Sequence, residues 1–99
     1  MLGKGASYYL IRDIVAITRD TEIESGEEAV LRSIVADLTD AETSAALDDF
    51  FDFEPLTLAI YDQFRMRGAL RERMLREKLA EFLIFCGHDD EAEGVLATL

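Results

Sequence analysis

The sequence predicts an all-α fold, a small single-domain bundle of about five helices over residues 1–99. Apolar residues recur at intervals of three and four along most of the chain, which is the period of an amphipathic helix. There is one proline, so helices should be interrupted rarely. Together with the helical spacing, this predicts a strand content near zero. The 99 residues, 49% of them hydrophobic, suffice for one core and not for two.

The first helix is expected from about Ser7, as its N-cap, to Asp20. Its apolar face combines two neighbouring rows of side chains: Tyr8, Ile11, Val15 and Thr18, and Leu10, Ile14 and Ile17. Because this face is wide, we expect the helix to be central to the core.

Two capping boxes predict the next helices. The first, Ser25 to Glu28, starts a helix over about 26–38 whose expected inward residues are Val30, Ile34, Val35 and Leu38. The second, Thr39 to Glu42, starts a helix that should end before Pro55, with inward residues Thr43, Ala46, Leu47 and Phe50. The short link between the two helices favours antiparallel packing.

A long helix is expected over about 55–86, with Pro55 as its first residue. Unbroken, it would be about 46 Å long, whereas a compact chain of this length has a radius of gyration near ~13 Å. We therefore expect a break or kink near Gly68, where a helix loses roughly 1 kcal/mol relative to alanine. If the helix does not break, its protruding part would pack on a second subunit as a homodimer.

A C-terminal helical hairpin is expected after Cys86, because Gly87 is placed to end one helix and His88 to Glu91 to start another. The hairpin resembles a tetratricopeptide-type hairpin in the spacing of Leu79, Ala80, Leu83, Gly87, Ala92, Leu96 and Leu99. The resemblance covers about a fifth of the chain, without a second copy at the family's period. It implies a small peptide-binding or co-chaperone domain with a helical groove.

The composition excludes several classes of partner. A formal net charge of −11 argues against direct nucleic-acid binding and against binding to acidic membranes. No run of about 18 apolar residues could span a membrane, and the first residues lack the pattern of a secretory signal. One cysteine excludes an internal disulfide framework, so we expect a reducing, cytoplasmic location.

Two stretches are candidate contact elements for another protein. Residues 48–54 alternate carboxylates with three phenylalanines, and three adjacent phenylalanines cannot all point inward from a helix. Residues 65–78 hold six of the ten basic residues, against two glutamates. Either the basic and acidic surfaces face each other, or each awaits a partner. The predicted partner-binding residues are Asp48, Asp49, Phe51, Asp52, Phe53, Arg65, Arg67, Arg71, Arg73 and Arg76.

An enzyme is not expected. Cys86 and His88 are separated by a helix-ending glycine, which seldom gives the geometry of a thiol nucleophile and its base. With one cysteine and one histidine, the chain lacks the ligands of a structural zinc site, and no cofactor motif is present. A thiol enzyme acting through these two residues stays as the third alternative.

The leading hypothesis is thus a non-enzymatic protein–protein interaction module: a small adaptor, chaperone or regulatory inhibitor. The alternative is an acidic polyanion mimic, such as a phage-encoded or mobile-element inhibitor, that occupies the nucleic-acid groove of its target. The two differ in salt dependence, since binding by mimicry should weaken steeply as salt rises.

Overall fold

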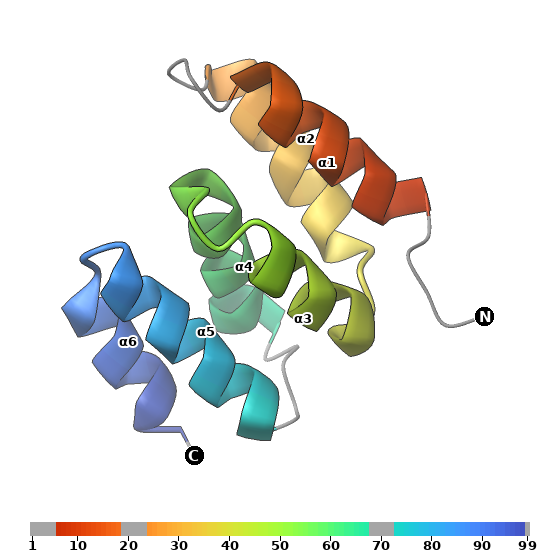
Figure 1. Cartoon of the computed structure of the whole chain (residues 1–99). Helices are drawn as coiled ribbons and strands as arrows, with labels where there is room; N and C mark the ends of the chain where they lie inside the picture. The colour runs from red at the N-terminus through yellow and green to blue at the C-terminus, as the bar shows by residue number, and fades with distance from the viewer. Residues whose placement is uncertain (1–5, 19–23, 68–72, 99) are drawn as a thin grey trace.

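The computed structural model describes residues 6–18, 24–67 and 73–98, and in these ranges it contains helices and no strand (Figure 1). The predicted all-α class is confirmed, with six helices in place of about five. They are α1 (Ala6–Thr18), α2 (Ser25–Ala36), α3 (Asp40–Asp49), α4 (Glu54–Arg67), α5 (Arg73–Phe85) and α6 (Asp89–Leu96).

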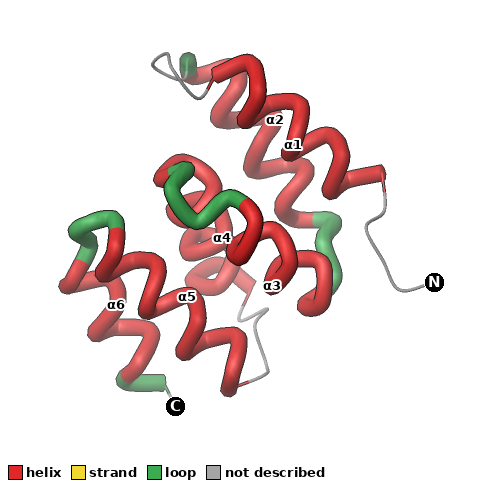
Figure 2. Tube along the Cα trace, viewed as in Figure 1, coloured by secondary structure: helices red, strands yellow, loops and turns green. Residues whose placement is uncertain are grey.

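The helices follow one another as three pairs, α1 with α2, α3 with α4, and α5 with α6, and Figure 2 shows short loops between α3 and α4 and between α5 and α6. Helix α2 packs against α4, and α5 packs against α3, α4 and α6. The molecule measures 34 × 33 × 21 Å along its principal axes, with a radius of gyration of 12.6 Å. In Figure 1, α4 and α5 lie in the middle of the molecule, and α1 and α6 lie at its opposite ends.

One hydrophobic core runs through all six helices. Its fully buried members include Leu56 and Ile60 of α4 and Leu79 and Leu83 of α5. Truncating such a leucine to alanine typically lowers the free energy of unfolding by about 2–5 kcal/mol. Because α4 and α5 contribute the centre of this core, they fix the position of the other helices.

Helix α1 buries only one of its two apolar rows. The buried row, at most 5% exposed, is Tyr8, Ile11, Val15 and Thr18. In the second row Leu10 is 51% and Ile17 is 75% exposed, and Ile14 is partly buried. The expectation of a central first helix is therefore wrong, because the bundle covers one side of α1 only. The helix also begins at Ala6, so Ser7 lies inside it.

Helix α2 starts one residue earlier than predicted. Its N-cap is Glu24, whose backbone amide donates a hydrogen bond to Glu27 Oε1 at 3.4 Å, so the box at Ser25 is displaced by one position. The inward residues are also shifted: Leu31 and Val35 are buried, whereas Val30 is 53% exposed.

The second capping box is confirmed. The Thr39 hydroxyl accepts a hydrogen bond from the Glu42 amide at 3.2 Å, and the Glu42 carboxylate accepts one from the Thr39 amide at 3.0 Å. These bonds satisfy backbone donors that the start of α3 would otherwise leave free. As predicted, α3 ends before Pro55, at Asp49.

The predicted long helix is two helices. Helix α4 ends at Arg67 and α5 begins at Arg73, so the expected break at Gly68 lies outside the described residues. Helices α4 and α5 pack against each other, so neither projects from the fold. Helix α4 begins at Glu54, which makes Pro55 its second residue. In α5 Leu75, Leu79 and Leu83 are buried, whereas Met74 is 80% exposed.

The predicted stop at Gly87 and the C-terminal hairpin are confirmed. Gly87 has φ 88°, its amide donates to Ile84 O at 2.9 Å, and the His88 amide donates to Leu83 O at 2.8 Å. This pair of bonds is the Schellman motif, which ends a helix at a left-handed residue. Helix α6 then folds back on α5 and buries Ala92 and Val95.

The left-handed conformation of Gly87 can be tested by substitution, with Gly94 as a matched control. Gly87→Ala should destabilise the fold by about 1–2 kcal/mol, because the left-handed backbone conformation is unfavourable for alanine. Gly94→Ala, the same chemical change inside α6 with open space around the new methyl group, should stabilise it by about 1 kcal/mol. Urea unfolding followed by circular dichroism measures both. Equal stability of Gly87→Ala and the unmodified chain would contradict the motif.

Candidate functional site

The three phenylalanines of the acidic-aromatic stretch have different environments. Phe53 is 5% exposed and belongs to the core, and Phe50 at the end of α3 is partly buried. Phe51, in the loop between α3 and α4, is 42% exposed. Of the three rings, Phe51 is therefore the most exposed to solvent.

Phe51 lies against two phenylalanines of α5. Its ring centroid is 5.3 Å from that of Phe85, in an edge-on arrangement, and 6.3 Å from that of Phe82. Phe85 is 61% exposed, and Phe82 packs partly on the core. We call these three residues the aromatic patch. Such ring pairs contribute about 0.5–1.5 kcal/mol beyond area burial, so the patch is held in place and still exposes two rings.

Carboxylates surround the aromatic patch. Asp52 follows Phe51 directly and is exposed, and Glu81 lies one helical turn before Phe85 on the same face of α5. Burial and the negative charges of Glu54 and Asp52 raise the pKa of Cys86, the residue after Phe85. The patch thus has an apolar centre and an acidic rim.

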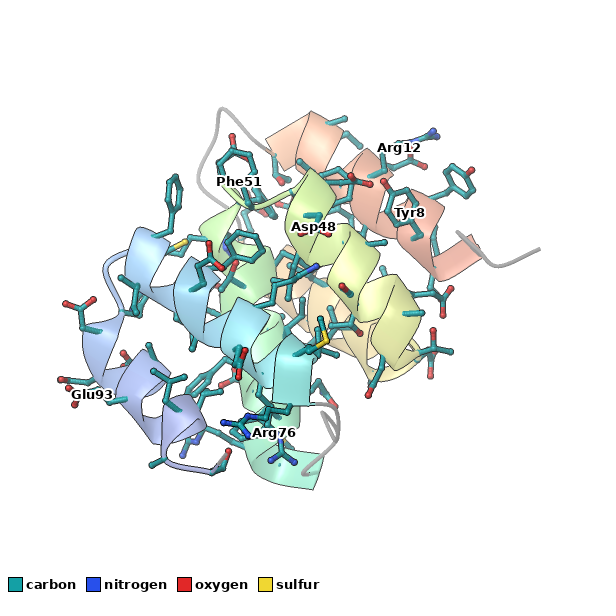
Figure 3. The ribbon with its side chains drawn as sticks, turned by 60° about the horizontal axis from the view of Figure 1, so that its bottom comes forward. Tyr8, Arg12, Asp48, Phe51, Arg76 and Glu93 are labelled. Atoms are coloured by element: carbon teal, nitrogen blue, oxygen red, sulfur yellow. The ribbon has the colours of Figure 1, made fainter. Side chains whose placement is uncertain are left out.

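Asp48 and Asp49, two further predicted contact residues, make contacts within the chain. Lys78 of α5 donates hydrogen bonds of 2.8 Å to both Asp48 and Ser44. Asp49 accepts a hydrogen bond from the Tyr8 hydroxyl of α1. The end of α3 is thereby tied to α5 on one side and to α1 on the other, and Figure 3 shows Asp48 between Tyr8 and the α5 ribbon.

The acidic charge is concentrated on two helices. Helices α3 and α6 each carry four carboxylates and no basic residue. Both pack against α5, and the aromatic patch lies where α5 ends. A basic group that approaches α3 or α6 would therefore meet four carboxylates and no basic side chain of that helix.

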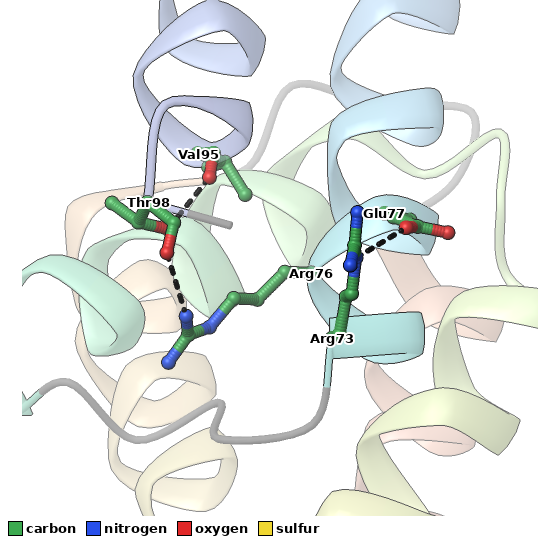
Figure 4. Close-up of polar contacts among 5 residues, drawn as sticks. All are labelled: Arg73, Arg76, Glu77, Val95 and Thr98. Carbon is green, nitrogen blue, oxygen red and sulfur yellow. Dashed lines mark hydrogen bonds and ion pairs between the residues drawn. The ribbon is translucent and has the colours of Figure 1, made fainter.

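The arginines predicted as a second contact element lie apart from the aromatic patch. Arg73 forms an ion pair with Glu77 at 3.2 Å, and Arg76 donates to the carbonyl oxygen of Thr98 at 3.2 Å (Figure 4). Arg76 lies in the first turn of α5, and Phe85 ends the helix about 13 Å further along its axis. In Figure 3, Arg76 and Phe51 lie at opposite ends of α5.

Of the other predicted arginines, Arg65 is the one whose side chain is described. The Arg65 guanidinium of α4 lies over the Tyr61 ring at 5.6 Å. Arg71 and the side chain of Arg67 lie outside the described residues. Within the described part of the chain, the predicted basic and acidic-aromatic stretches meet at the ion pair of Lys78 with Asp48.

Cys86 and His88 do not face each other as a nucleophile and base. His88 Nε2 lies 2.9 Å from Glu54 Oε2, which ties the start of α6 to the start of α4. Burial is the main cause that raises the pKa of the Cys86 thiol above its ordinary value, and the negative charge of Glu54 is the second. A raised pKa lowers the thiolate fraction, and the thiolate is the reactive form.

Neither a metal site nor a membrane span is found in the described ranges. No three His, Cys, Asp or Glu side chains in residues 6–18, 24–67 and 73–98 are grouped to hold an ion. Over the same ranges, every helix is too short or too polar to cross a bilayer.

Sequence reasoning missed Phe85, which has the larger exposure of the two outer rings in the patch. The sequence did contain a sign of this acidic-aromatic grouping: Phe82 and Phe85 are one helical turn apart, and Glu81 directly precedes Phe82. The pairing with Phe51, 34 positions earlier, depends on tertiary packing and has no local signal.

The pKa of Cys86 gives a test of the thiol-enzyme alternative. We expect Cys86 to react with a disulfide reagent at neutral pH more slowly in the native chain than in the urea-unfolded chain. The rate should rise with pH, with a midpoint above that of the unfolded chain, because the fold favours the protonated thiol. Native labelling faster than unfolded labelling would contradict this, and Cys86→Ser serves as the blank.

Comparison with known proteins gives no family for the chain. No protein-family model matches the sequence, no curated protein matches it, and no solved structure matches the fold. The tetratricopeptide-type resemblance of residues 79–99 therefore has no support from a family match.

Proposed function

We propose that this chain is a non-enzymatic interaction module that binds another protein through the aromatic patch. The observation that carries the proposal is the pair of exposed rings, Phe51 and Phe85, which come from distant segments and are held edge to face. Aromatic anchors ringed by polar groups are the usual energetic centre of protein interfaces. A small adaptor, chaperone or regulatory inhibitor would use such a surface.

The partner that fits this surface is apolar at its centre and basic at its edge. The apolar part would cover the two exposed rings, and lysine or arginine side chains would meet Asp52, Glu54 and Glu81. The acidic helices α3 and α6 on either side of α5 would steer such a partner from a distance. With a single cysteine in the chain, we place this interaction in a reducing, cytoplasmic compartment.

The second candidate function is mimicry of a polyanion. The four carboxylates on each of α3 and α6 favour it, because a nucleic-acid-binding protein recognises rows of negative charge. This function would not need the aromatic patch. The two candidates therefore differ in one set of residues.

The test uses alanine variants of the patch and a matched control. Phe85→Ala should weaken partner binding by about ten-fold or more, as hot-spot truncations do, with little change in melting temperature because the ring is 61% exposed. Met74→Ala, on the same helix and 80% exposed, should bind like the unmodified chain. Proteins captured from the source cells by the unmodified chain and lost with Phe85→Ala would be purified and their affinities measured.

Three results distinguish the candidates. Loss of binding in Phe85→Ala with binding that persists at high salt supports the interaction module. Binding that is unchanged in Phe85→Ala and weakens steeply between about 0.1 M and about 0.5 M salt supports the polyanion mimic. A large fall in melting temperature in Phe85→Ala would contradict the assignment of this ring as a contact residue. Phe51→Ala should lose binding too, with a greater loss of stability because Phe51 has two ring contacts.

A further inference from the structure

Helix α1 carries a row of apolar side chains that the bundle covers only in part, since Ile14 packs partly on the core. Leu10, Ile14 and Ile17 follow one another at intervals of four and three, so they form one stripe about 10 Å long on the helix surface. Leu10 is 51% and Ile17 is 75% exposed. The stripe lies beside the buried row that holds α1 to the rest of the fold, so the apolar face of α1 is about twice as wide as the part that is covered.

The packing of α1 explains why the stripe faces outward. Helix α1 packs on α2 and α3, where the Tyr8 ring lies 5.6 Å from that of Phe50. In Figure 1 it lies at the edge of the molecule, with the other helices on one side. Nothing in the described part of the chain covers the opposite side, and a surface of this kind is typical of an interface.

The charge of α1 identifies what could cover the stripe. In a chain of net charge −11, α1 has one arginine and one aspartate, Arg12 and Asp13, which form an ion pair of 3.5 Å with each other. A second copy that approached through α3 or α6 would place four carboxylates against four. The neutral stripe avoids this repulsion. A basic partner, in contrast, would gain more from α3 and α6 than from α1.

We propose that the stripe of Leu10, Ile14 and Ile17 is a homodimer interface, in which α1 packs antiparallel on α1 of a second copy. A two-fold axis near Ile14 would place Leu10 of each copy against Ile17 of the other, as a self-complementary surface requires. The interface lies on a different helix from the aromatic patch. A dimer would therefore present two copies of that patch, one on each subunit.

Sedimentation or light scattering tests this proposal. Between about 10 µM and about 500 µM chain, the mass should rise from 11.1 kDa toward twice that value. Association should strengthen between about 0.05 M and about 0.5 M salt, because salt screens the repulsion of two acidic chains without weakening apolar contact. Ile17→Lys should weaken dimerisation at least about ten-fold, because a charge would have to be desolvated in the interface.

A matched control separates apolar contact from net charge. Met74→Lys makes the same charge change at a side chain that is 80% exposed on α5, and it should dimerise at least as well as the unmodified chain. Circular dichroism should show both variants folded, since both positions are exposed. A monomer at every concentration, a dimer that survives Ile17→Lys, or association that weakens as salt rises would each overturn the proposal.

Discussion

Burial of one face of α5 is the constraint on which the rest of the structure depends. Leu75, Leu79 and Leu83 lie at intervals of four, so they form a single stripe, and α3, α4 and α6 all pack against this helix. Because neighbouring helices cover this stripe, the exposed part of α5 holds its polar residues together with Met74, Ile84 and Phe85. The Schellman turn at Gly87 then ends the helix and reverses the chain, which places α6 beside it.

The same packing determines where charge accumulates. Two of the helices around α5 carry four carboxylates each, whereas α1 at the other end of the molecule is neutral. Like charges that share a side of a small domain cost stability and are retained where they serve solubility or steering. The molecule therefore has two unlike surfaces: an acidic side with exposed aromatic rings, for which we propose a basic partner, and a neutral apolar stripe, for which we propose a second copy of the chain.

Local signals predicted local structure well. The reciprocal hydrogen bonds of Thr39 and Glu42 and the left-handed stop at Gly87 need only neighbouring residues, and both were found where the sequence placed them. The N-cap of α2 shifted by one position, because Glu24 and Glu27 form the same kind of pair as Ser25 and Glu28. Such a choice depends on chain geometry that spacing alone does not contain.

Tertiary features were harder to predict. Apolar spacing indicates the width of the apolar face of a helix, but it does not indicate how much of that face the fold covers. For this reason the sequence predicted a central α1, whereas Leu10 and Ile17 are exposed. Helix periodicity also ran on across residues 55–86, where the structure has two separate helices. The candidate site was half predicted: residue type indicated Phe51, whereas Phe85 became part of the site only when α5 packed beside the α3–α4 loop.

Nuclear magnetic resonance of the isolated chain can test whether the rings of Phe51 and Phe85 form the aromatic patch. The account predicts nuclear Overhauser contacts between the ring protons of Phe51 and Phe85, whose centroids are 5.3 Å apart. A soluble paramagnetic probe should attenuate the Phe85 ring strongly and the buried Phe53 ring weakly. Absence of the contact between the two rings, or protection of Phe85 equal to that of Phe53, would contradict the account.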